Sequence, residues 1–333
     1  MQPLAWHRHE FDRLIALGSA LPHALLLRGP RGVGKLVFAR ALGEVLLCEA
    51  RVDGRACGSC VACAWFAAGT HPDFRQIEPG SETAAAEEGE KKSASISVDQ
   101  IRELPDFINI SSHRGGPKVL VIQPAEALNV NAANALLKSL EEPPAGTYFV
   151  LVTHRPHQLL PTIRSRCQQI ALALPDRAAA RAWLADKGLR QPDVALSHFS
   201  DAPLLAHALE ETEYWGARAA FMRHLTASDV DVLAAGEAVR DFQIPYVIAW
   251  LQKWSYDLVH SRFVGGVRYN PDYAEIAARL APRLDAIELT RFHRDMIGLQ
   301  RVAQHPLNPR LFIEDALLGY RDLVRSGHVD TVP

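Results

Sequence analysis

Residues 29–35 read GPRGVGK and lie between a short apolar run, HALLLR at 23–28, and a helical pattern, LVFARALGEVLL at 36–47. The order strand, glycine-rich loop, helix is that of a phosphate-binding loop. In such a loop, glycines let backbone N–H groups converge on phosphates, and a lysine reaches the outer ones. The spacing assigns these roles to Gly29, Gly34 and Lys35. We therefore predict an α/β domain that begins with a loop of this type.

Apolar runs alternate with helical patterns over the following stretch. Residues 118–122 (KVLVI) form a continuous apolar run of the kind that is buried on both faces of a parallel sheet, and we expect this strand to be central. Further strands are expected at 74–78, at 147–153 and at the end of 159–170, with a helix at 131–142 that Pro143 and Pro144 stop. The alternation over residues 1–172 predicts a mostly parallel sheet.

The pattern changes beyond residues 172–176, where the strand signal stops and amphipathic helices continue to the C-terminus. We expect two all-α parts, 173–212 and 213–333, with the softer boundary near 211–215. In the last helix one buried stripe is predicted from the helical spacing of its apolar residues: Leu311, Ile313, Leu317, Tyr320 and Val324.

Residues 79–95 are polar, rich in small residues and without periodicity, so a mobile loop is predicted there. Order should resume at Ser97, which can cap a helix that runs toward Leu104.

The composition excludes several classes of protein. The chain has 333 residues, of which 48% are hydrophobic and 22% are charged, and this is the balance of ordinary globular domains. The formal net charge of -2 argues against a protein that coats nucleic acid with its whole surface, so any contact with DNA should be local. We see no export signal and no apolar run long enough to span a bilayer, which predicts a cytoplasmic protein without membrane attachment.

Four of the five cysteines fall in one short window, with the spacing C-x8-C-x2-C-x2-C: Cys48, Cys57, Cys60 and Cys63. Four thiolates complete the coordination shell of one tetrahedral Zn²⁺, and closed sites of this kind are structural. Free buried cysteines and disulfides are the alternatives. The fifth, Cys167, is expected to be a small buried residue and not a nucleophile, and His71 is expected to be a turn or cap residue and not a metal ligand.

The parts of an ATPase that bind metal and activate water are missing. Leu36 stands where the loop motif has a hydroxyl for Mg²⁺. Gln123 and Pro124 follow the 118–122 strand where an acidic pair is needed, and Glu126 is expected to point elsewhere. Hydrolysis by this chain is therefore not expected. The loop is either kept for its fold or occupied at times by a nucleotide or another anion.

Taken together, these segments resemble the clamp-loader branch of the AAA+ family. The resemblance is carried by GPRGVGK at 29–35, the cysteine module at 48–63, NALLKSLEEPP at 134–144 and SRC at 165–167. GTHPD at 69–73 is more similar to a non-motor subunit of that branch than to its motor. The implied fold is an AAA+ domain (1–172) with an inserted zinc module, a helical lid (173–212) and a helical collar (213–333).

The resemblance also implies roles for residues. Arg166, between Ser165 and Cys167, matches the arginine finger that reaches the γ-phosphate of ATP held by a neighbouring subunit. Thr153 matches the sensor-one position, so Gly29, Gly34, Lys35 and Thr153 would form a degenerate nucleotide site. The second sensor arginine is replaced by leucine within residues 200–206.

Implied partners are the tau/gamma motor subunits, the delta subunit, the beta sliding clamp and primed DNA, within a DNA polymerase holoenzyme and with no intrinsic activity of this chain. Two other hypotheses stay open, an ATP-hydrolysing motor of the same branch and a zinc-containing DNA-binding module.

Overall fold

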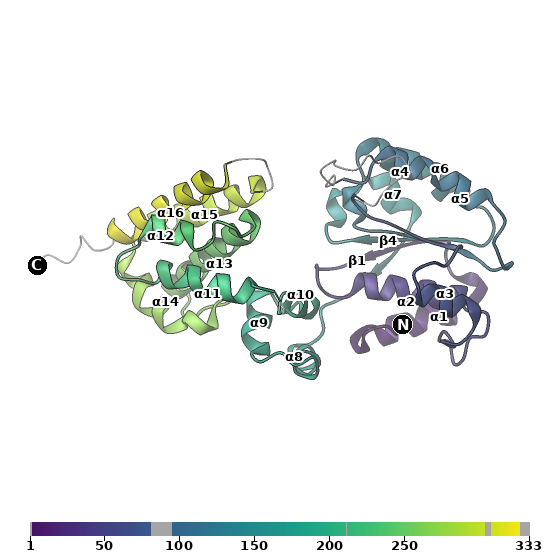
Figure 1. Ribbon diagram of the computed structural model, residues 1–333, viewed down its shortest axis with the longest axis horizontal. Helices are drawn as coiled ribbons and strands as arrows, with labels where there is room; N and C mark the ends of the chain where they lie inside the picture. The colour runs from purple at the N-terminus through teal and green to yellow at the C-terminus, as the bar shows by residue number, and fades with distance from the viewer. Residues whose placement is uncertain (1, 81–94, 211, 304–307, 327–333) are drawn as a thin grey trace, which may run out of the picture. The chain divides into compact units, whose positions relative to one another are not determined.

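A computed structural model describes residues 2–80, 95–210, 212–303 and 308–326, so most of the expected mobile loop lies outside the described residues. The chain divides into two compact units, Met1–Pro175 and Asp176–Pro333 (Figure 1). This division falls within residues 172–176, where the strand pattern of the sequence stops.

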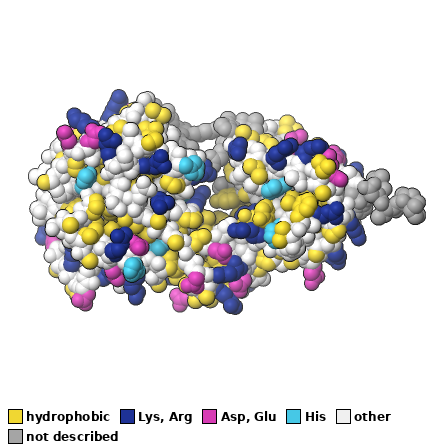
Figure 2. Space-filling view, turned by 180° about the vertical axis from the view of Figure 1, so that it is seen from behind, with side chains coloured by type: hydrophobic (Ala, Val, Ile, Leu, Met, Phe, Trp, Pro, Cys, Tyr) yellow, Lys and Arg dark blue, Asp and Glu magenta, His cyan; other side chains and the backbone are white. Residues whose placement is uncertain are grey.

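The described surface mixes charges of both signs. On the face shown in Figure 2, Lys and Arg side chains are interspersed with acidic and apolar ones. Among the described helices, none has the length and apolar character that crossing a membrane requires.

The first unit is built on a five-stranded sheet with the order β2-β3-β4-β1-β5. Its strands are β1 Ala24–Arg28, β2 Phe74–Ile77, β3 Lys118–Ile122, β4 Thr147–Thr153 and β5 Gln168–Ala171. All four strand pairings are parallel, which confirms the predicted parallel α/β sheet. The strand expected to be central, β3, lies inside the sheet between β2 and β4, and the middle position of the five is taken by β4. Both strands are almost completely buried, so the apolar pattern of the sequence does not show which of them lies in the middle.

Helices cover both faces of this sheet (Figure 1). One layer contains α1 Arg8–Ala16, α2 Lys35–Leu47 and α3 Val61–Ala67; the other contains α4 Val98–Arg102, α5 Leu104–Asn109, α6 Val130–Glu141 and α7 Pro161–Arg166. Successive strand residues face opposite layers: Leu25 and Leu27 belong to the core under α1 and α2, whereas Leu26 belongs to the core under α4 to α7. Apolar strands are required because both faces are covered.

Local signals account for several helix ends. The Ser97 hydroxyl accepts a hydrogen bond from the Gln100 N–H (3.3 Å), and the Gln100 side chain accepts one from the Ser97 N–H (2.9 Å). This capping box starts α4 where Ser97 predicted it. At the other end of the same layer, α6 stops at Glu141, just before Pro143 and Pro144.

In the second unit the described residues form helices and no strand. A small apolar cluster joins the first three, α8 Arg177–Asp186, α9 Pro192–His198 and α10 Pro203–Ala208. A larger cluster joins α11 Tyr214–Leu225, α12 Val232–Glu237, α13 Ile244–Phe263, α14 Ala274–Leu280, α15 Ala286–Val302 and α16 Pro309–Ser326.

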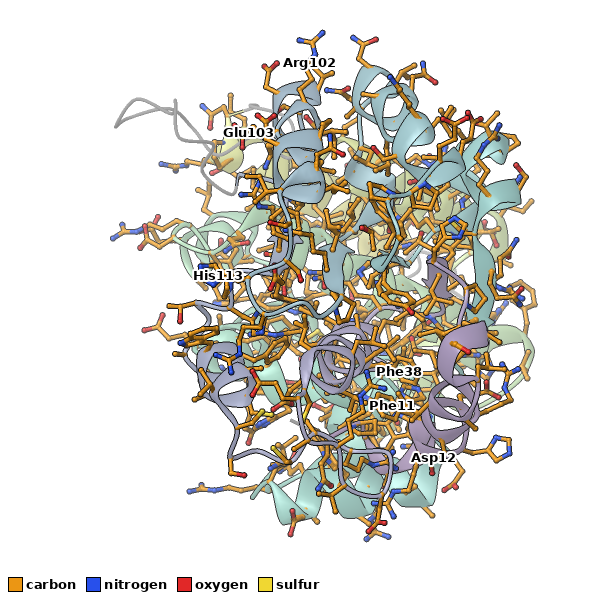
Figure 3. All side chains as sticks on the ribbon, turned by 90° about the vertical axis from the view of Figure 1, so that its right-hand side faces the viewer. Phe11, Asp12, Phe38, Arg102, Glu103 and His113 are labelled. Atoms are coloured by element: carbon orange, nitrogen blue, oxygen red, sulfur yellow. The ribbon has the colours of Figure 1, made fainter. Side chains whose placement is uncertain are left out.

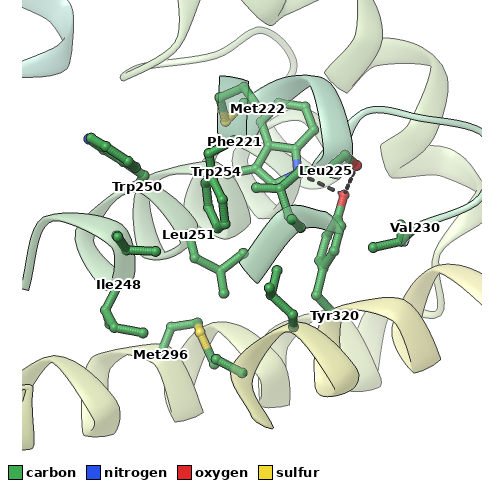
Figure 4. Close-up of a cluster of buried hydrophobic side chains, with 14 of the residues drawn as sticks. Phe221, Met222, Leu225, Val230, Ile248, Trp250, Leu251, Trp254, Met296 and Tyr320 are labelled. Atoms are coloured by element: carbon green, nitrogen blue, oxygen red, sulfur yellow. Dashed lines mark hydrogen bonds between the residues drawn. The ribbon is translucent and has the colours of Figure 1, made fainter. Parts of the chain in front are cut away.

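Aromatic side chains form the centre of the larger cluster (Figure 4). Trp250 and Trp254 are almost completely buried, so both pack inside the helical unit. The Trp254 indole N–H donates to the Tyr320 hydroxyl (2.8 Å), which in turn donates to the Leu225 carbonyl (2.9 Å). A chain of two hydrogen bonds thus ties α13, α16 and α11 together.

The predicted stripe of α16 is confirmed at four of its five residues. Ile313, Leu317, Tyr320 and Val324 are buried, but Leu311 is 63% exposed. Leu311 precedes Ile313 by two residues, which places the two side chains about 200° apart around the helix axis. Its inclusion in the stripe was therefore wrong.

Candidate functional site

The glycine loop follows β1 and leads into α2, as predicted. Gly34 has φ +103° and stands directly before the first residue of α2. A Cβ on Gly34 would lie 2.2 Å from Cδ1 of Leu4, and one on Gly29 would lie 2.2 Å from the carbonyl oxygen of Leu172. Both positions therefore need glycine, because other parts of the first unit press directly against the loop.

Lys35 is turned toward its own loop. Its buried ammonium group donates to the carbonyl oxygens of Gly29 (2.6 Å) and Pro30 (2.5 Å). Burial lowers the pKa of Lys35 to about 8, against the opposing effect of the Glu126 carboxylate, which raises it. In the structure described here, the Lys35 ammonium group therefore stabilises the loop.

The N-terminal segment covers this loop. The Trp6 indole N–H donates to the Val33 carbonyl (3.1 Å), next to the contact of Leu4 with Gly34. Behind it, Phe11 of α1 meets Phe38 of α2 edge to face, with ring centroids 5.2 Å apart (Figure 3). Composition and motif spacing had given no signal for this cover, because it depends on contacts between separate elements.

The other side of the loop is formed by the end of β4. Thr153 is paired with Arg28 in the sheet, so it lies beside the start of the loop. Its hydroxyl is fully buried and accepts a hydrogen bond from the Arg155 N–H (3.1 Å). Thr153, which the resemblance matched to the sensor-one position, therefore lies near the loop. Its hydroxyl oxygen, however, is bonded to the backbone two residues further on.

Glu126 does not point away from the loop, contrary to our expectation. Its carboxylate accepts hydrogen bonds from the His154 N–H (3.0 and 3.3 Å), and its charge acts on Lys35. The short 3-10 turn Ala125–Ala127 after Pro124 redirects the chain in this way. Burial lowers the pKa of His154 to about 4, and the charge of Lys35 contributes to that decrease.

Positions 36 and 123 carry neither the hydroxyl that would bind Mg²⁺ nor a carboxylate that would activate water. Gln123 keeps its side-chain oxygen buried and without a hydrogen-bond partner among the described residues. Leu36 packs against the apolar core between the sheet and α2. These two side chains therefore bring neither a hydroxyl nor a carboxylate to the loop.

The four clustered cysteines come together as predicted. Their sulfur atoms all lie within 4.8 Å of one another, and none of the cysteines is in a disulfide. The Sγ atoms of Cys48 and Cys60 are 4.0 Å apart, as are those of Cys57 and Cys63. A tetrahedral zinc site with Zn–S bonds of 2.3 Å needs sulfur atoms about 3.8 Å apart. The set therefore fits one metal ion of that size.

Backbone groups orient these thiols. The Cys57 N–H donates to the sulfur of Cys48 (3.2 Å), and the Cys60 N–H donates to that of Cys57 (3.3 Å). Hydrogen bonds from the backbone of Ser59 and Cys60 lower the pKa of Cys57 to about 6, whereas burial raises the pKa of Cys48. His71 is not in the cluster; its Nδ1 accepts from the Asp73 N–H (3.1 Å), which is the turn role that we predicted.

Arg166 is the last residue of α7. Its Nη1 donates to the Thr162 carbonyl (3.0 Å), and its Nη2 forms an ion pair with the carboxylate of Glu141, the last residue of α6. The two side chains are 34% and 47% exposed. Cys167, which follows, is buried, and burial raises its pKa to about 11. Its burial agrees with the expected small buried residue. The partner of Arg166 had not been predicted.

Known proteins with similar sequences or folds match this chain over much or nearly all of its length. A protein-family model described as "DNA polymerase III, delta subunit" matches residues 10–176. The DNA polymerase III subunit delta' of Pseudomonas aeruginosa is 40% identical over 250 residues, 72% of this chain and 73% of the relative. The subunit of the same name from Escherichia coli K12 is 32% identical over 98% of both chains. A solved gamma subunit-related protein from Thermotoga maritima shares the fold, with a TM-score of 0.53 at 19% identity, over 95% of this chain and 99% of that one.

Proposed function

This chain belongs to the family of DNA polymerase III delta-prime subunits, and from that membership we propose that it works as a non-catalytic subunit of a clamp loader. Such an assembly opens the ring-shaped sliding clamp and places it on primed DNA. The observation that carries this proposal is the similarity to a delta-prime subunit over 98% of both chains. It extends through the helical second unit as well as the α/β domain.

The loop chemistry supports the absence of ATP hydrolysis by this chain. Lys35 is bonded to the loop's own carbonyl groups, and Leu36 contributes to the core. Gln123 and Pro124 supply no carboxylate for a metal or for water activation. The rival hypothesis of an ATP-hydrolysing motor would be supported if the purified chain hydrolysed ATP and lost that activity on Lys35→Ala.

We propose that Arg166 acts in trans, as an arginine finger on ATP bound by a neighbouring subunit. A guanidinium is permanently charged and can form two parallel hydrogen bonds to phosphate oxygens. The side chain lies at a helix end and is partly exposed, so another chain can approach it. Arg166 would thus serve the ATPase of its neighbour although its own loop is inactive.

We propose that Cys48, Cys57, Cys60 and Cys63 hold one structural Zn²⁺. The ion would supply a cross-link between the end of α2 and the start of α3, with no open coordination position for a reaction. The rival hypothesis, a DNA-binding zinc module, lacks support from charge: the net charge is -2, and basic side chains are interspersed with acidic ones on the face shown in Figure 2.

The domain roles complete the proposal. Residues 173–212 would form the lid and 213–333 the collar that joins this chain to the tau/gamma and delta subunits. The sliding clamp and primed DNA would be met through the assembled loader. We propose that the chain works with these partners in the cytoplasm.

The test is the ATPase rate of the reconstituted loader with clamp and primed DNA, with wild-type chain or with Arg166→Ala. Removal of a trans arginine should lower turnover by about ten-fold or more. Arg13→Ala is the matched control, because it removes an arginine that pairs on the surface of α1 with Glu10. Size exclusion verifies assembly. Unchanged turnover in an intact Arg166→Ala loader would mean that this chain has only a structural role.

A further inference from the structure

We propose that Glu141 is a latch for Arg166, a carboxylate that holds the guanidinium on its own subunit until ATP on the neighbour competes for it. This inference rests on the finger role proposed above. Its structural basis is the meeting of two helix ends, because Glu141 closes α6 and Arg166 closes α7. The prolines at 143 and 144 fix where α6 stops and therefore where its last carboxylate lies.

Both terminal nitrogens of Arg166 are engaged by its own chain. Nη1 donates to the Thr162 carbonyl (3.0 Å), and Nη2 pairs with Glu141. Two parallel hydrogen bonds to a phosphate can be formed by these same nitrogens. In the structure described here the guanidinium is therefore held by groups of its own subunit, and these groups compete with a phosphate on a neighbour.

Charge favours that exchange once a nucleotide is present. The Glu141 carboxylate neutralises the guanidinium, so the pair offers no net positive charge to a distant phosphate. A triphosphate carries several negative charges and outcompetes a single carboxylate at close range. Both partners of the pair are substantially exposed, so the pair holds the arginine weakly. Removing the carboxylate should shift the equilibrium between held and released Arg166 by no more than about five-fold, or about 1 kcal/mol.

The adjacent residue provides a matched control. Glu142 is also an exposed glutamate, yet it forms no ion pair within the described chain. Glu141→Gln and Glu142→Gln therefore remove the same charge from neighbouring positions, and only the first removes a partner of Arg166. An effect of general surface charge would be the same in both variants.

The experiment measures steady-state ATP hydrolysis by the reconstituted loader, first without clamp and primed DNA and then with both. We expect Glu141→Gln to raise kcat/KM for ATP about two- to five-fold in the absence of clamp and DNA. The maximal rate at saturating ATP, with both present, should be unchanged, because ATP on the neighbour then already holds Arg166. Glu142→Gln should have the kcat/KM of the wild type. Glu141→Asp keeps the carboxylate, so its kcat/KM should stay close to that of the wild type.

A double-mutant cycle separates this role from a merely structural one. If Glu141 acts through Arg166, Glu141→Gln has no effect in the Arg166→Ala background. A change that persists in that background overturns the latch, as does lower turnover in Glu141→Gln or identical behaviour of the two glutamine variants. If Arg166→Ala alone leaves turnover unchanged, the finger role fails first and the latch fails with it, so the two failures can be told apart.

Discussion

Leu36, Gln123 and Pro124 each stand where an ATPase of this fold needs a polar catalytic group, and in the structure each position is occupied by a side chain that cannot supply one. Leu36 packs into the core, and Gln123 keeps a buried oxygen without a partner among the described residues. The cysteine cluster, by contrast, has the groups that its proposed role needs, because four metal-binding sulfur atoms lie within 4.8 Å of one another. At the residue scale, the four cysteines converge on one point, whereas Leu36 and Gln123 bring no hydroxyl or carboxylate to the loop.

The cysteine cluster leads to a prediction about metal content. We expect the purified chain to contain about one zinc ion, and Cys63→Ser to lose most of it and to unfold at lower temperature. Elemental analysis and thermal melting measure the two effects. Cys167→Ser is the control, because this buried thiol is not part of the cluster and its replacement should leave the zinc content unchanged. Equal zinc content in wild type and Cys63→Ser would contradict the site.

At the scale of elements, helix faces decide which residues stabilise the protein. Helix α16 presents Ile313, Leu317, Tyr320 and Val324 to the large aromatic cluster, whereas Leu311 lies on its solvent side. The same residue type in the same helix therefore has two different environments. In the first unit, α6 and α7 pack their apolar faces into the core, and their last residues bring Glu141 to Arg166.

The two leucines of α16 give a matched pair of substitutions. Leu317→Ala should lower the free energy of unfolding by about 2–5 kcal/mol, because it leaves a cavity in the core. Leu311→Ala should change it by no more than about 0.5 kcal/mol. Urea unfolding of the purified chain measures both. Similar losses for the two variants would mean that α16 is rotated from the orientation described here.

At the scale of the whole molecule, five described histidines that are buried or half-buried have a lowered pKa, and they occur in both units. Burial lowers the pKa of each of them, namely His7, His71 and His154 in the first unit and His198 and His293 in the second. An unfolded histidine takes up its proton near pH 6.5. These side chains therefore stay neutral in the folded chain at pH values where the unfolded chain is already protonated.

This difference predicts how stability depends on pH. The pKa of His154 is about 4 in the folded chain, so between about pH 6.5 and 4 the unfolded state binds more protons than the folded state. The free energy of unfolding should decrease as the pH falls through this window. Urea titrations at a series of pH values measure it, and His154→Gln should reduce the slope. A flat profile between about pH 6.5 and 5 would refute the prediction.

The sequence by itself determined the features that depend on neighbouring residues. Strand and helix periods predicted the parallel α/β sheet, the spacing of Gly29, Gly34 and Lys35 predicted the loop, and four closely spaced cysteines predicted a cluster. Such patterns are local, because they repeat within one element or one short window. The absence of catalytic groups at Leu36, Gln123 and Pro124 could be seen in the same way.

Only the tertiary structure decided which distant residues meet. It placed β4 in the middle of the sheet, brought Leu4 over Gly34, joined the Glu126 carboxylate to the His154 N–H and paired Glu141 with Arg166. Each of these contacts joins segments that are separate in the chain, so no period or spacing encodes it. The packing of helices and strands around a shared core sets these distances, and that packing depends on all the elements at once.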